Sequence, residues 1–126
     1  MTDPDTILLV DDNVDVREGM QHMLEVEGYT VRPAANGRAA LALLFAGLRP
    51  CVIVMDMAMP LMNGFEFREQ QLKHADIADI PFIAYSAVID LQRSAQHLHA
   101  AAYLEKPIEF EHVLSIIREH CGHCGP

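Results

Sequence analysis

Short apolar runs alternate with longer amphipathic segments along the whole chain. Runs such as 7–10 and 51–55 show no polar alternation, which is typical of strands buried on both faces of a parallel sheet. Gly, Asn and Pro residues punctuate the chain between these runs and mark the ends of elements. The pattern predicts five strands, at residues 7–10, 29–32, 51–55, 80–84 and 101–104.

Helical periodicity fills the segments that follow the strands. The last segment places Phe110, Val113, Leu114 and Ile117 on one face, the i, i+3, i+4, i+7 stripe of an amphipathic helix. Asn36 is a favourable N-cap for an Ala- and Leu-rich helix. The predicted helices cover about residues 14–27, 39–46, 64–74, 91–98 and 109–120, of which 91–98 has the weakest pattern.

Five successive strand–helix units predict one α/β domain, a parallel sheet covered by helices on both faces with right-handed crossovers. We expect this domain to span residues 1–120 and residues 121–126 to form a flexible tail. In open sheets of this kind, ligands bind beyond the carboxyl ends of the strands. The residues directly after each strand are therefore the candidates for chemistry.

Composition and charge narrow the classes of function. The chain has 126 residues, and its 51% hydrophobic content is enough for one sizeable core. A formal net charge of −9 argues against a general nucleic-acid surface, which needs clustered Lys and Arg. Because no apolar run could cross a bilayer and the first residues lack a signal-peptide pattern, we expect a cytoplasmic protein with no membrane role.

Polar residues follow four of the predicted strands. Asp11 and Asp12 follow the first strand, Asp56 the third, Ser86 the fourth and Lys106 the fifth. Each has an ordinary structural interpretation when taken alone, as a helix cap or a surface charge. Together they would share one edge of the sheet, where three carboxylates require protons or a cation. Mg²⁺ suits oxygen ligands, and the set suits phosphoryl transfer to a carboxylate nucleophile.

At these residues the sequence resembles the receiver domains of two-component response regulators, over about residues 7–118. Four motifs carry the resemblance, each placed at the end of its predicted strand. The motifs are Leu-Val-Asp-Asp at 9–12, Asp-Met-Ala-Met-Pro-Leu-Met-Asn-Gly at 56–64, Ser-Ala at 86–87 and Tyr-Leu-Glu-Lys-Pro-Ile at 103–108. The resemblance implies the flavodoxin-like (βα)5 fold with strand order 2-1-3-4-5.

The resemblance also implies a role for each site residue. Asp56 would accept a phosphoryl group from a sensor histidine kinase or phosphotransfer protein. Asp12 would bind Mg²⁺ directly and Asp11 mostly through water, with Asp56 and the main-chain oxygen of Ala58 as further ligands and Mn²⁺ as a substitute. Lys106 would contact the phosphoryl group.

The same resemblance implies a conformational switch. Phosphorylation would draw in Ser86, and Tyr103 would turn inward behind it, reshaping the face made by the fourth helix, the fifth strand and the fifth helix. The Lys106–Pro107 peptide bond is expected to be cis. This face would bind a downstream protein, an output domain absent from the chain, or a second copy in a homodimer.

Three cysteines, Cys51, Cys121 and Cys124, do not suggest a disulfide framework, because their number is odd and no secretion signal is present. Cys51 is expected to be a buried and inert thiol. The end of the chain, Cys-Gly-His-Cys, looks like the active-site sequence of protein disulfide isomerases, and its spacing also suits a metal. Since it follows the last predicted helix rather than opening one, a frayed tail is the favoured interpretation.

Two other functions compete with the phosphorylation switch. A receiver-shaped interaction module could act without phosphate, although the complete set of site residues argues against it. A haloacid-dehalogenase-type phosphohydrolase also uses a carboxylate nucleophile, but such enzymes need a second Asp two residues later, where this chain has Ala58. We therefore expect a protein that catalyses only its own phosphorylation and dephosphorylation, and not a turnover enzyme.

Overall fold

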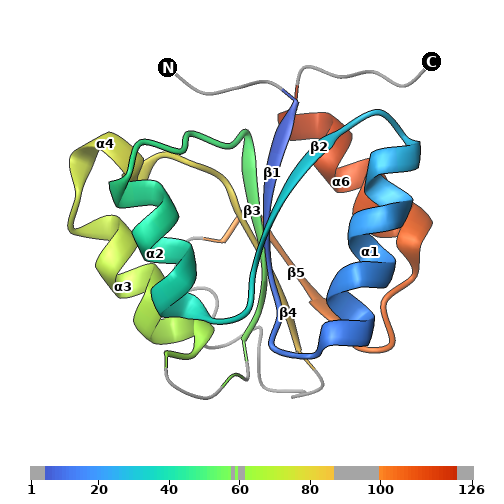
Figure 1. Cartoon of the computed structure of the whole chain (residues 1–126), viewed down its shortest axis with the longest axis horizontal. Helices are drawn as coiled ribbons and strands as arrows, with labels where there is room; N and C mark the ends of the chain where they lie inside the picture. Colours follow the sequence, from blue (N-terminus) through green and yellow to red (C-terminus); the bar gives the residue numbers. More distant parts are fainter. Residues whose placement is uncertain (1–4, 58, 60–61, 87–99, 122–126) are drawn as a thin grey trace.

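The computed structural model describes residues 5–57, 59, 62–86 and 100–121. Its centre is a five-stranded parallel sheet of order β2-β1-β3-β4-β5, as the sequence predicts (Figure 1). The strands are β1 (Thr6–Val10), β2 (Thr30–Ala34), β3 (Val52–Asp56), β4 (Phe82–Ser86) and β5 (Ala102–Glu105). Pro33 lies in β2, an edge strand, where the missing amide donor is tolerated.

Helices cover both faces of this sheet. Helices α2, α3 and α4 lie on one face, and α1 and α6 lie on the other (Figure 1). Their bounds are α1 (Val14–Val26), α2 (Gly37–Phe45), α3 (Gly64–Leu72), α4 (Ala75–Ala78) and α6 (Phe110–His120). Asn13, Asn36 and Asn63 are the N-caps of α1, α2 and α3, and each side chain accepts a backbone N–H.

Alternate residues of the central strands point into two separate apolar clusters. Leu8, Ile53 and Phe82 belong to the cluster beneath α2, α3 and α4. The neighbouring residues Leu9 and Val54 belong to the cluster beneath α1 and α6. Burial on both faces explains why the central strands are continuous apolar runs in the sequence.

Several boundaries differ from the predicted ones. Strands β3 and β4 extend through Asp56 and Ser86, because these polar residues continue the ladder at the edge of the sheet. Helix α3 ends at Leu72, and the short helix α4 that follows it was not predicted. The predicted helix at 91–98 lies outside the described residues.

Cys51 is buried as expected, but the expectation that it is a free thiol was wrong. Cys51 forms a disulfide with Cys121, 70 residues away along the chain, and their Cα atoms are 5.3 Å apart. Both residues are buried in the cluster beneath α1 and α6. The fold brings the start of β3 and the end of α6 together, which an odd cysteine count could not reveal. Cys121, the first residue of the expected tail, is therefore packed against the core.

No helix in the described part of the chain is both long enough and apolar enough to span a bilayer.

Candidate functional site

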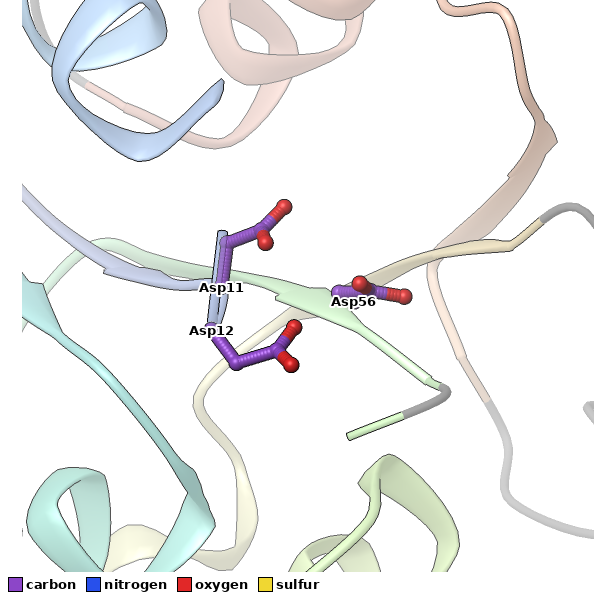
Figure 2. Close-up of side chains that lie close together, drawn as sticks. All are labelled: Asp11, Asp12 and Asp56. Atoms are coloured by element: carbon purple, nitrogen blue, oxygen red, sulfur yellow. The ribbon is translucent and has the colours of Figure 1, made fainter. Parts of the chain in front are cut away.

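Three carboxylates gather at the carboxyl ends of the adjacent strands β1 and β3. One oxygen from each of Asp11, Asp12 and Asp56 lies within 4.8 Å of the other two. Figure 2 shows the three side chains grouped where these strands end. Asp11 and Asp56 are buried, whereas Asp12 is exposed. The cluster therefore has a fixed inner side and one side open to solvent.

Asp11 is held by hydrogen bonds to both of its carboxylate oxygens. Its Oδ1 accepts the backbone N–H of Asn13 at 2.8 Å, and its Oδ2 accepts the hydroxyl of Tyr85 at 2.6 Å. The guanidinium of Arg17 donates to the Asp11 carbonyl oxygen at 2.7 Å. The two hydrogen bonds from Asn13 and Tyr85 to the carboxylate are charge-assisted, and such bonds stabilise a buried carboxylate and fix its orientation.

Tyr85 is a site residue that the sequence analysis missed. It lies on β4 opposite Asp56, and its ring is fully buried. Burial first, and then the hydrogen bond to Asp11 and the nearby carboxylates, raise the pKa of Tyr85 well above its ordinary value. Tyr85 therefore remains a protonated donor to Asp11. A tyrosine inside a buried strand needs a partner for its hydroxyl, which is the signal that could have identified it.

Lys106 brings an ammonium group to the site. Its Nζ lies 3.1 Å from Asp56 Oδ2 and 5.4 Å from the centre of the Tyr85 ring. The backbone N–H of Lys106 donates to the Ser86 carbonyl at 2.9 Å, which fixes the end of β5 beside β4. The Lys106–Pro107 peptide bond is cis.

The remaining predicted site residues have different outcomes. Ser86 is buried at the end of β4, beside the strand that carries Asp56. Tyr103 is half-buried on β5 and packs against the cluster beneath α2, α3 and α4. Ala58 lies outside the described residues.

The charges and donor atoms of the cluster fit a hard divalent cation. Three carboxylates face one ammonium group, so the cluster has an excess of negative charge. All the donor atoms are oxygens, the ligands that Mg²⁺ prefers. Asp12 is exposed, so the cation can enter without displacing the core.

Comparison with known proteins identifies the class. The profile of the response regulator receiver domain matches residues 7–118, and the chain belongs to this family. It is similar to the response regulator MprA of Mycolicibacterium vanbaalenii, with 37% identity over 91% of this chain and 49% of that protein. A 14.6 kDa protein of Leptolyngbya boryana is also 37% identical, over 91% of this chain and 88% of its own length.

Solved structures agree with this assignment. The chemotaxis protein CheY4 of Vibrio cholerae has a TM-score of 0.84 and 29% identity, over 94% of this chain and 99% of that chain. FixJ-N has a TM-score of 0.82 and 29% identity, over 100% of this chain and 99% of that chain.

The chain is thus a receiver domain of two-component phosphorelay signalling, a signalling module and not a turnover enzyme. Its acidic pocket of Asp11, Asp12 and Asp56 is consistent with the metal site of receiver domains. The chain spans about half the length of the MprA proteins that it matches.

Proposed function

We propose that Asp56 accepts a phosphoryl group from a phosphohistidine on a sensor histidine kinase or phosphotransfer protein. The observation that carries this proposal is the position of Asp56, at the end of the central strand β3 between two other carboxylates and the Lys106 ammonium. A carboxylate fixed in this way can attack phosphorus, because catalysis of phosphoryl transfer is mostly positioning and charge neutralisation.

Asp11, Asp12 and Asp56 would hold Mg²⁺, with Mn²⁺ as a substitute and the main-chain oxygen of Ala58 as a further ligand. The cation neutralises the charge of the phosphoryl oxygens when it is bound. Asp12 is the open carboxylate and suits direct coordination. Both oxygens of Asp11 already accept hydrogen bonds, which favours contact through water.

Lys106 and Ser86 would stabilise the transferred group. The Lys106 ammonium pairs with Asp56 and can shift to a phosphoryl oxygen when the carboxylate is phosphorylated. The Ser86 hydroxyl can donate a hydrogen bond to another oxygen. Tyr103 on β5 would then turn inward, so that the face containing β5 and α6 changes shape.

The response is read by a partner. A downstream protein, an output domain on a longer chain or a second copy of this chain would bind the altered face, in the cytoplasm and without direct contact to nucleic acid or membrane. An interaction module that works without phosphate is the second candidate, because the face exists before any phosphorylation.

The test is incubation of the protein with Mg²⁺ and acetyl phosphate, followed by intact-mass measurement. We expect one added phosphoryl group in the wild type and none in Asp56→Asn. Chelation of Mg²⁺ should remove the adduct as well. Asp15→Asn, which changes an exposed carboxylate on α1, is the matched control and should be phosphorylated like the wild type.

The outcomes separate the two candidates. An adduct that survives Asp56→Asn would contradict the assignment of the acceptor. Partner binding that is equal in the wild type and in Asp56→Ala, with and without acetyl phosphate, would favour the phosphate-independent module.

A further inference from the structure

The disulfide between Cys51 and Cys121 lies at the edge of the sheet opposite the acidic pocket. Cys51 precedes β3, and Asp56 ends the same strand. The covalent link therefore joins the start of the strand that carries Asp56 to the end of α6. None of the chemistry proposed for Asp56 uses it.

The last turn of α6 buries little of its own surface. Ile117 is the last buried apolar residue of the helix, and residues 118–120 are exposed. Arg118 pairs with Glu27 at 3.1 Å, but both side chains are about one-third exposed and such surface pairs contribute little. Within the described residues beyond Ile117, only Cys121 returns to the core.

The surroundings of the pair also suit the reduced state. Cys51 Sγ lies 3.2 Å from the Thr6 carbonyl oxygen, so a free thiol at this position has a hydrogen-bond acceptor already in place. Cys121 is the C-cap residue of α6, and helix ends open locally at low cost. Its sulfur can therefore become accessible without unfolding of the domain.

We propose that Cys51 and Cys121 form a reversible redox site that latches the end of α6 to the start of β3. Oxidation by a low-molecular-weight disulfide such as oxidised glutathione forms the Cys51–Cys121 bond and breaks the glutathione S–S bond. The two cysteine sulfurs lose two electrons, and the two thiol protons pass to the two glutathione thiols. A small dithiol reverses the reaction and frees the last turn of α6.

This inference rests on the proposed function only for its cytoplasmic setting, where disulfides are mostly transient or redox-sensing. The latch connects to signalling through α6, which belongs to the face that we propose a partner reads. Cys124 follows Cys121 by three residues in the sequence and is the thiol that could compete with Cys51 for pairing with Cys121.

The pairing is tested first, with no phosphoryl donor present, so the result does not depend on whether Asp56 accepts phosphate. The 126-residue chain is equilibrated in glutathione buffers of graded ratio, quenched with acid, alkylated and analysed by tandem mass spectrometry. We expect Cys51 linked to Cys121 under oxidising conditions and both alkylated under reducing conditions. Cys124→Ser should behave like the wild type, and Cys51→Ala should lose the link.

Release of the last turn is tested by limited trypsin digestion. Reduction should accelerate cleavage after Arg118 at least tenfold more than it accelerates cleavage after Lys73, at the end of α3, because any loosening of the whole domain raises both rates alike. In Cys121→Ser, cleavage after Arg118 should be fast with or without reductant.

Three results would overturn the proposal. They are a Cys121–Cys124 disulfide in place of the Cys51 link, a Cys51–Cys121 link that persists in the native protein at every glutathione ratio, and equal acceleration at Arg118 and Lys73. The last would mean that reduction loosens the whole domain and not the end of α6.

Discussion

At the scale of single residues, the contact between Tyr85 and Asp11 joins the core to the acidic pocket. The Tyr85 ring belongs to the apolar cluster beneath α1 and α6, and its hydroxyl is 2.6 Å from Asp11 Oδ2. A buried carboxylate that loses such a donor is left poorly solvated.

We therefore expect Tyr85→Phe to lower the free energy of unfolding by about 1–3 kcal/mol in Mg²⁺-free buffer. Urea denaturation measures this change. In an Asp11→Asn background the same substitution should cost less, because the charge that needs the donor is gone. Equal costs in the two backgrounds would mean that the hydroxyl does not act through Asp11.

The raised pKa of Tyr85 also predicts how stability depends on pH. The folded protein keeps the Tyr85 proton above the ordinary tyrosine pKa of 10.0, whereas the unfolded chain releases it near that pH. The contribution of the Tyr85 hydroxyl to the free energy of unfolding is therefore fully present below pH 10 and is lost as the pH rises above 10. The stability difference between the wild type and Tyr85→Phe should narrow by about 1.4 kcal/mol per pH unit there. A difference that stays constant from pH 8 to pH 11 would contradict this assignment.

The sequence predicted most of the residues of the acidic pocket but not Tyr85, whose hydroxyl holds Asp11. Asp11, Asp12, Asp56 and Lys106 do meet, because parallel strands place their carboxyl ends at one edge. Tyr85 escaped notice because an aromatic residue inside an apolar run looks like core. Only the register of β3 against β4, and the reach of the side chain to β1, give its hydroxyl a role.

At the scale of elements, the start of α2 lies unusually close to the segment after β3. A Cβ added at Gly37 would lie 2.8 Å from the Met62 carbonyl oxygen and 2.9 Å from Met62 Cβ. Backbone atoms cannot move aside as the end of a flexible side chain can.

We expect Gly37→Ala to destabilise the protein by about 1–3 kcal/mol, despite the better helix propensity of Ala, because overpacking outweighs it. Thermal or urea denaturation measures the effect. Gly19→Ala, in the interior of α1, is the matched control, since a Cβ there meets nothing within 4 Å. It should stabilise the protein by about 0.5–1 kcal/mol. Stabilisation by both substitutions would refute the close approach at Gly37.

The sequence predicted the type and order of the elements better than their ends. Asn36 caps α2 as expected, because a short polar side chain just before an apolar helix can accept a free backbone N–H of its first turn. Helix α4 has only four residues and no side-chain cap, so no periodicity could indicate it. It forms where Gln71 of α3 donates to the carbonyls of Ile77 and Ile80, a contact between residues brought together by the fold.

At the scale of the whole molecule, the disulfide closes a loop that contains most of the second half of the fold. It joins residues separated by 70 positions, and closing a loop of that length removes a large entropy from the unfolded chain. Reduction should therefore lower the free energy of unfolding by about 4 kcal/mol.

Urea denaturation of the wild type with and without a dithiol reductant measures this difference. Cys121→Ser should show no response to the reductant. A wild-type protein whose midpoint is also unaffected would show that the cross-link adds no stability. The pairing could not be predicted from the sequence, because it depends on Cα atoms 5.3 Å apart that only the complete fold brings together.

Strand β3 connects the redox site at Cys51 to the proposed phosphorylation site at Asp56. Cys51 directly precedes the five residues of β3, and Asp56 is the last of them, so both side chains lie on one short stretch of chain. Cleavage after Arg38 and Arg68 leaves Cys51 and Asp56 in a single fragment. This fragment therefore reports the redox state of Cys51 and the phosphorylation of Asp56 in the same molecule. The proportions of fragments with both modifications, with one and with neither would show whether oxidation and phosphorylation are independent, cooperative or mutually exclusive.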